Sequence, residues 1–241
     1  MSIFKFNLSE NYRVLKKIII AIDGPAASGK STTAKRVADR LGYLHIDTGA
    51  MYRAMALKVL RSNISPTDTA SIARLTDSTT VRLVQSEHSD GKLRVELDGQ
   101  EVSDEIRLPE VTNIVSAVSL VPEVRALMVK EQRAMGINGG IVLEGRDIGT
   151  VVFPNAELKI FMKADSRERA RRRLKELEAK GISVPLETLE REILERDSID
   201  SQRELSPLRK ADDAIELDTT HLTIDQQVDF IVEKAKQIIN T

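Results

Sequence analysis

The fold of this chain is decided by the stretch Gly24-Pro25-Ala26-Ala27-Ser28-Gly29-Lys30-Ser31. It matches the phosphate-loop pattern of glycine, four residues, glycine, lysine and serine or threonine. The residues before it, at 18–22, form an apolar, β-branched run typical of a strand buried on both faces. After it, small and apolar residues recur at helical spacing, and Gly42 stands where a helix would end. The stretch therefore lies in the strand–loop–helix context that the motif requires.

Such a loop has a defined chemistry. Its glycines let backbone N–H groups turn inward around phosphate oxygens, helped by the positive end of the helix dipole. We expect Lys30 to reach the β- and γ-phosphates of ATP and the Ser31 hydroxyl to be a ligand of Mg²⁺. The alternative, a glycine-rich turn that matches by chance, is disfavoured by the flanking strand and helix. The predicted ATP-binding residues are Gly24, Pro25, Ala26, Ala27, Ser28, Gly29, Lys30, Ser31 and Thr32.

Bulk composition limits the classes of protein that this chain can be. Its 241 residues include 36 basic and 37 acidic side chains, with a formal net charge of −1. That balance favours neither a nucleic-acid-binding nor a membrane-binding surface. Cysteine is absent, which excludes disulfides, a thiolate zinc site and a thiol nucleophile. We find no signal-peptide pattern and no run of transmembrane length, so a cytoplasmic protein is expected, by default a monomer.

The hydrophobic pattern predicts an α/β fold with a parallel sheet covered by helices on both faces. Between residues 79 and 102 the pattern changes to strict alternation, with turn signals at Asp90-Gly91 and Asp98-Gly99. We interpret this segment as a small antiparallel β insertion. The expected strands of the parallel sheet are 18–22, 44–46, 141–143, 158–162 and 214–217. Helices are expected at 50–60, 68–75 and 186–203, with others beginning at Pro122 and Ser166 and a closing helix before the C-terminus.

Polar residues follow the predicted strands where each strand ends. They lie at 24–31, 47–49 and 144–147 and at Asp165. Ligands of open α/β sheets bind at the carboxyl ends of the strands. We therefore expect these four groups to meet at one cleft.

Arginine is prominent near this predicted cleft. Arg53 and Arg146 follow two of the strands, and the positions of Arg196, Asp200 and Arg203 share one face of the predicted helix at 186–203. A solvated helix face is the commoner origin of such a pattern. The planar guanidinium fork, however, suits a phosphate dianion, because it keeps its charge and forms bidentate hydrogen bonds. Several arginines beside a phosphate loop predict a second phosphorylated ligand next to ATP.

Four stretches together resemble the bacterial cytidylate kinases, in the superfamily of P-loop nucleoside monophosphate kinases. The most specific is Glu144-Gly145-Arg146-Asp147-Ile148-Gly149-Thr150-Val151-Val152-Phe153-Pro154. The others are Ile22-Asp23-Gly24-Pro25, Asp47-Thr48-Gly49-Ala50-Met51-Tyr52-Arg53, and Glu195-Arg196-Asp197 with Asp200 and Arg203. The resemblance runs from about Lys17 to the C-terminus, and the β insertion fits it.

The resemblance implies an enzyme that transfers the γ-phosphoryl group of ATP to CMP or dCMP with Mg²⁺, giving CDP or dCDP and ADP. It implies the three-layer P-loop NTPase fold with a parallel sheet, a small antiparallel β insertion and a lid. The kinase domain would cover 17–241, with an acceptor-binding segment at about 47–135 and the lid at about 166–203. Residues 1–16 would be a flexible leader with no assigned function.

The resemblance also implies roles for single residues. The acceptor phosphate would be held by Arg53, Arg146 and Arg203. Cytosine would be read by Ser116, Arg125 and Asp147. Around the sugar and phosphate of the acceptor would lie Thr48, Tyr52, Arg196 and Asp200. The catalytic set would be Lys30, Arg146 and Arg203. Mg²⁺ would be bound by Ser31, with Glu144 holding a water on the metal. The basic stretch that approaches ATP when the lid closes would be Arg169, Arg172 and Arg173.

Three alternatives stay open. The first is a related kinase of another small acceptor, such as UMP, AMP or shikimate, which the β insertion and the string at 144–154 disfavour. The second is a non-catalytic nucleotide-binding regulator, perhaps of RNA, which the near-neutral charge and the intact Lys30 and Ser31 disfavour. The third concerns Asp147 alone, which could serve only to orient Arg146 through an ion pair.

Overall fold

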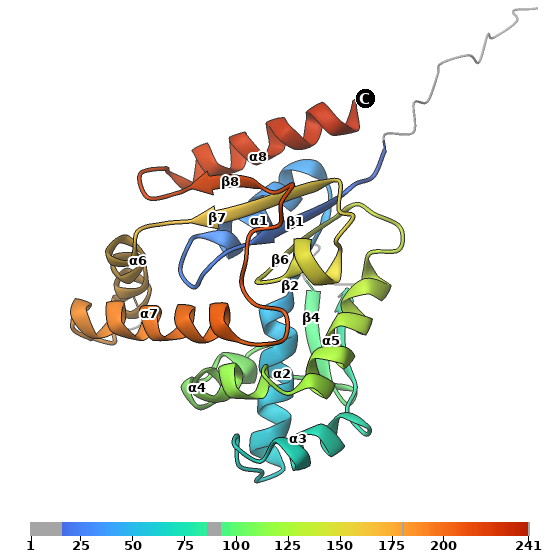
Figure 1. Ribbon diagram of the computed structural model, residues 1–241, viewed down its shortest axis with the longest axis vertical. Helices are drawn as coiled ribbons and strands as arrows, with labels where there is room; N and C mark the ends of the chain where they lie inside the picture. The colour runs from blue at the N-terminus through green and yellow to red at the C-terminus, as the bar shows by residue number, and fades with distance from the viewer. Residues whose placement is uncertain (1–15, 86–92, 180, 241) are drawn as a thin grey trace, which may run out of the picture.

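The structure is a computed structural model that describes residues 16–85, 93–179 and 181–240. The predicted leader at 1–16, except for its last residue, and the turn predicted at Asp90-Gly91 lie outside the described residues. The described chain is α/β, with helices around a five-stranded and a three-stranded sheet (Figure 1). The helices are α1 (Lys30–Leu41), α2 (Thr48–Arg61), α3 (Thr69–Thr76), α4 (Pro109–Val118), α5 (Pro122–Met135), α6 (Ser166–Glu178), α7 (Leu186–Gln202) and α8 (Ile224–Ile239), with short turns η1 (Glu105–Arg107) and η2 (Ile148–Val152).

The five-stranded sheet is entirely parallel and has the order β2-β6-β1-β7-β8. β1 lies at its centre, where Ile20 pairs with Val142 of β6 and with Leu158 of β7. Because all strands run the same way, their carboxyl ends share one edge of the sheet. The strands are β1 (Ile19–Asp23), β2 (Leu44–Asp47), β6 (Ile141–Gly145), β7 (Leu158–Lys163) and β8 (Ile215–Asp218).

Both faces of this sheet are covered, as the apolar runs of its strands predict. On one face Ile20 and Ile22 share a core with α1 and α8. On the other face Ala21 shares a core with Val152 of η2. The alternation of side chains along β1 thus builds two apolar layers from one strand, and the predicted three-layer fold is confirmed.

A second core fills the lower half of the molecule in Figure 1. It joins α2, α4 and α5 to the antiparallel sheet of β3 (Val81–Gln85), β4 (Leu93–Leu97) and β5 (Gln100–Glu101). Asp98 and Gly99 have φ of 51° and 79° and form the tight turn between β4 and β5. The predicted insertion is therefore confirmed. No single helix in the described ranges could span a membrane by length and composition, although α4 and α5 pass that test as a pair bent by 102°.

α6 and α7 lie side by side at the left of Figure 1, with a small core of their own. Ala170 of α6 packs there with Leu189 and Ile193 of α7. The carboxylate of Asp165 begins α6 by accepting hydrogen bonds from the N–H groups of the first helical turn. This pair corresponds to the segment predicted from the sequence at 166–203.

Candidate active site

The phosphate loop joins β1 to α1 at the carboxyl edge of the sheet. A Cβ on Gly24 would lie 2.2 Å from the carbonyl oxygen of Met162, so no side chain fits there. Gly29, directly before α1, has φ of 93°, a left-handed value that glycine adopts most easily. Ala27 is also left-handed, at φ 57°. Successive turns of this kind form the concave arrangement of backbone that binds anions.

Lys30 lies folded over this loop. It is 6% exposed, and its Nζ donates to the carbonyl oxygen of Pro25 at 2.9 Å. Burial, and after it the positive charge of Arg146, lowers the pKa of Lys30 to about 7, while the negative charge of Glu144 opposes the shift. A nearby anion would stabilise this buried cation, which is the role predicted for Lys30.

Side chains from other elements hold the loop from outside. Arg169 of α6 donates to the carbonyl oxygen of Ala26 at 3.2 Å. The carbonyl oxygen of Ser28 accepts from Thr219 at 2.9 Å and from Arg172 at 3.3 Å. The loop thus keeps its shape through hydrogen bonds to its carbonyl groups, and these bonds do not occupy its N–H groups. Arg173 pairs with Glu176 on the exposed side of α6. The approach of Arg169, Arg172 and Arg173 to ATP stays a prediction.

Oxygen groups suited to Mg²⁺ meet next to Lys30. The Ser31 hydroxyl donates to Glu144 Oε2 at 2.5 Å, and His45 Nε2 lies 3.1 Å from Glu144 Oε1. Glu144 is buried at the end of β6. A hydroxyl and a carboxylate fit the preference of Mg²⁺ for a few oxygen ligands plus water and phosphate. Among the described residues, no group of three or more His, Cys, Asp or Glu is placed to bind a metal by itself.

Asp200 of α7 contacts two of the arginines that were predicted to bind the acceptor phosphate. Arg146 Nε donates to Asp200 Oδ2 at 2.7 Å, and Arg203 Nη1 lies 3.9 Å from Asp200 Oδ1. Although burial raises the pKa of Asp200, the positive charge of Arg146 lowers it overall. The helix ends at Gln202, in agreement with the predicted end at about Arg203. Arg203 itself has an extended backbone, and its Nε donates to the carbonyl oxygen of Ser206 at 2.5 Å.

Arg53 and Arg196 belong with Arg125, Arg146 and Arg203 to a group of neighbouring side chains, which we call the arginine cluster. Arg53 Nη2 donates to Asp47 Oδ2 at 2.9 Å. Burial, and then the positive charge of Arg146, lowers the pKa of Arg196 to about 10. The described residues supply no hydrogen-bond partner for four buried guanidinium nitrogens, which are Arg53 Nε, Arg125 Nε, Arg196 Nε and Arg203 Nη2. Buried donors without partners are costly, so this cluster is suited to an anionic ligand that accepts from them.

Asp147 pairs with other arginines than Arg146, the residue that it would orient in the third alternative from the sequence. It forms a buried ion pair with Arg125 of α5, and its Oδ1 lies 3.8 Å from Arg203 Nη2, while Arg146 pairs with Asp200. The guanidinium of Arg125 stands 5.5 Å from the centre of the Tyr52 ring. Burial raises the pKa of Tyr52 to about 12. These side chains form a buried polar group that contacts Arg203.

The remaining predicted residues lie on nearby elements. Thr48, at the start of α2, donates its hydroxyl to the carbonyl oxygen of Glu144 at 2.6 Å. Ser116 is half-buried on α4, which packs on α2 and contacts α7. Three of the four groups expected at the strand ends therefore meet. The fourth, Asp165, follows β7 at the same edge of the sheet and caps α6, whose first N–H groups need that carboxylate.

Two carboxylates have roles here that the sequence did not reveal. Asp47 caps α2 through Ala50 and also pairs with Arg53, and this cap starts α2 two residues before the predicted helix. Asp23 accepts hydrogen bonds from the N–H groups of Ile148 and Gly149. Both are the last residue of a strand at the ligand-binding edge and stand in stretches that carry the family resemblance, but neither signal names their hydrogen-bond partners.

Comparison with known proteins agrees with this geometry. The family model described as cytidylate kinase matches residues 20–237. A cytidylate kinase of Chloroherpeton thalassium is 54% identical over 232 residues, covering 93% of this chain and 96% of the relative. Cytidylate kinases of a Geobacillus species and of Bacillus subtilis are 54% and 50% identical, covering 90% and 92% of this chain and 95% and 98% of those relatives.

Proposed function

The chain belongs to the cytidylate kinase family, and from this premise we propose how its residues transfer the γ-phosphoryl group of ATP to CMP or dCMP. The products are CDP or dCDP and ADP. One observation carries the assignment of the acceptor side: four buried guanidinium nitrogens that have no hydrogen-bond partner among the described residues lie beside a phosphate loop. Such a cluster provides charge-assisted hydrogen bonds for a second phosphate.

On the donor side, the loop N–H groups and Lys30 bind the β- and γ-phosphates. Ser31 would be the direct protein ligand of Mg²⁺, and Glu144 would hold a water on it; their hydrogen bond at 2.5 Å keeps the two groups together. The metal, when bound, neutralises charge on the phosphate oxygens. Phosphoryl transfer depends on positioning and charge neutralisation more than on covalent chemistry.

On the acceptor side, Arg53, Arg146 and Arg203 hold the phosphate of CMP in line with the γ-phosphate. That phosphate is already an anion at neutral pH, so no general base is needed. The sugar and phosphate are further contacted by Thr48, Tyr52, Arg196 and Asp200. The base is read by Ser116, Arg125 and Asp147. The carboxylate of Asp147 accepts from the amino group of cytosine but would face the carbonyl of uracil with like polarity.

The segment at 47–135 acts as the acceptor-binding part of the kinase domain at 17–241, and the segment at 166–203 acts as the lid. Contacts of Arg169 and Arg172 with the phosphate loop support a lid that responds to ATP. Closure would exclude water and suppress hydrolysis of ATP. We further expect a cytoplasmic monomer that binds neither nucleic acid nor membrane, in keeping with a net charge of −1.

The test is a coupled assay of ADP release with ATP, Mg²⁺ and each nucleoside monophosphate in turn. We expect CMP and dCMP to be phosphorylated, with kcat/KM for CMP at least about a hundredfold above that for UMP, because a mismatched base leaves buried polar groups unpaired. UMP or AMP as the preferred acceptor would establish one of the related kinases instead. Nucleotide binding without turnover would establish the regulator.

A further inference from the structure

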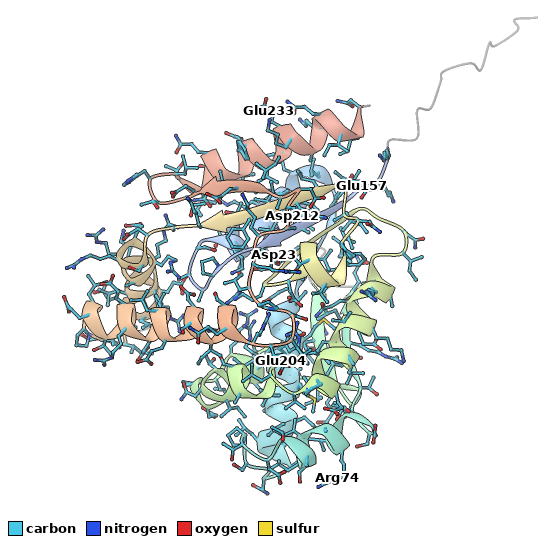
Figure 2. The ribbon with its side chains drawn as sticks, in the orientation of Figure 1. Asp23, Arg74, Glu157, Glu204, Asp212 and Glu233 are labelled. Carbon is cyan, nitrogen blue, oxygen red and sulfur yellow. The ribbon has the colours of Figure 1, made fainter. Side chains whose placement is uncertain are left out.

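Asp23 holds the turn that carries the base-reading residue, although it belongs to the donor side of the chain. It ends β1 directly before the phosphate loop and is 5% exposed. Its Oδ1 accepts from the N–H of Ile148 at 2.8 Å, and its Oδ2 accepts from the N–H of Gly149 at 2.7 Å. Both residues open η2, directly after Asp147. Figure 2 labels Asp23 near the middle of the molecule.

Asp147 occupies the position from which a residue usually caps the turn that follows it. Its carbonyl oxygen accepts from the N–H groups of Val151 and Val152, at 2.9 and 3.2 Å. Its carboxylate, however, makes no capping hydrogen bond and pairs with Arg125. An aspartate at such a position ordinarily accepts from the N–H of the second or third residue of its own turn, here Gly149 or Thr150. Because Asp23 already accepts from the N–H of Gly149, the carboxylate of Asp147 is turned to Arg125 instead of to its own turn.

The space around this contact is closed. A Cβ on Gly149 would lie 3.4 Å from Asp23 Oδ2 and 3.2 Å from Cδ of Lys159. Lys159 is itself fixed, because its Nζ binds the carboxylate of Asp213 at 2.8 Å. Asp23 and Lys159 thus confine Gly149, and η2 has little freedom to shift.

Burying the charged carboxylate of Asp23 costs free energy unless hydrogen bonds compensate for it. Burial raises its pKa to about 6, the two backbone N–H groups lower it, Asp147 raises it and Lys30 lowers it. An amide or an apolar residue would avoid the cost of burying this carboxylate. A carboxylate with two oxygens is needed only if both N–H groups of η2 must be held.

We propose that Asp23 is a positioning residue for cytosine recognition: by capping η2 from the end of β1, it keeps the Asp147 carboxylate turned toward Arg125 and the base. This inference rests on the proposed role of Asp147. In Asp23→Asn, one oxygen is replaced by an NH₂ group that faces a backbone donor, so an N–H of η2 is released. The carboxylate of Asp147 then turns back to cap its own helical turn and leaves the base.

The experiment measures KM for CMP and for ATP in the full chain, wild type and Asp23→Asn. We expect KM for CMP to rise about tenfold, the scale seen when an orienting hydrogen-bond partner is removed, and the preference for CMP over UMP to shrink. KM for ATP is expected to change less than about threefold, which a general loss of structure would not produce. In an Asp147→Asn background, Asp23→Asn should change KM for CMP less than about twofold, because Asp23 acts through Asp147.

Two further variants complete the test. Gly149→Ala disturbs the same contact from the other side and should give the same split between the two KM values if Asp23→Asn does not fold. Asp68→Asn is the matched control, since Asp68 caps α3 by accepting from the N–H of Ser71 at 3.0 Å and lies far from the site in sequence. Equal changes in both KM values, no change, or additive effects with Asp147→Asn would overturn the proposal. A wild type without preference for CMP would instead overturn the proposed role of the base pocket.

Discussion

The donor side and the acceptor side of this site are built in opposite ways. The donor side is one continuous stretch, 24–32, whose carbonyl groups are held by α6 and by Thr219. The acceptor side combines arginines from α2, α5, α7 and the ends of β6 and α7, and four of their nitrogens have no hydrogen-bond partner in the described chain. The loop is thus a single segment whose shape is fixed by contacts from α6 and Thr219, whereas the dispersed arginines need an anionic ligand to accept from their remaining N–H groups.

The largest effect is expected on the donor side. Lys30→Ala should lower kcat at least about a hundredfold, because positioned charge is the main catalytic contribution in phosphoryl transfer. The fold should survive, since the buried ammonium carries a desolvation cost that lowers its pKa. Turnover and circular dichroism of the variant check both statements. Lys35→Ala, at an exposed position of the same helix, is the control and should match wild type. A folded Lys30→Ala with normal turnover would contradict the assignment.

On the acceptor side, Arg203→Lys keeps the charge but loses the planar fork. We expect kcat/KM for CMP to fall about tenfold or more, and the Kd of ATP measured alone to stay within about twofold. The side chain is only 5% exposed, so the shorter ammonium has no route to the same partners. Arg209→Lys, an exposed position nearby, serves as control. An equal loss of ATP affinity would assign Arg203 to the donor side and erase the contrast between the two sides.

The residues proposed to read the base, Ser116, Arg125 and Asp147, also belong to the acceptor side. Asp147→Asn should reduce the preference for CMP over UMP from about a hundredfold to about tenfold, because an amide can turn its donor toward the uracil carbonyl. The measurement is kcat/KM for both substrates in both proteins. Asp77→Asn, exposed at the end of α3, controls for the change of charge. A constant ratio with both activities reduced equally would show that the ion pair with Arg125 is only structural.

The smallest effect concerns Asp23, which joins the two sides. Its folded pKa of about 6 lies above its usual value of 3.8, so the native state binds more protons between these values and loses stability as pH rises through them. Relative to Asp23→Asn, wild type should therefore lose about 1 kcal/mol of unfolding free energy between pH 5 and pH 7. Urea unfolding of both proteins at each pH measures it. Asp147 and Lys30 are present in both proteins, so their titration does not distinguish them. If the unfolding free energies of the two proteins changed with pH in parallel, the raised pKa of Asp23 would be contradicted.

Much of the molecule was predictable because its causes are local. The phosphate loop, the parallel strands, the turn at Asp98-Gly99 and the end of α1 at Gly42 follow from short-range patterns of apolar residues and glycine, and all are confirmed. The ends of helices depend on single side chains that a periodic pattern does not show. α2 starts two residues before the predicted helix because Asp47 caps it, and α7 ends at Gln202, where the backbone of Arg203 becomes extended.

The sequence by itself determined the fold class, the position of the phosphate loop and, through its resemblance to a family, which residue types gather at the strand ends. Only the tertiary structure decided the partners. Arg146 is 54 residues from Asp200, and Asp23 is 125 residues from Ile148, yet each pair shares a hydrogen bond. Helical and strand periods carry no information about such distant pairs. They arise when packing of whole layers brings the elements together, and burial then requires each polar group to find a partner.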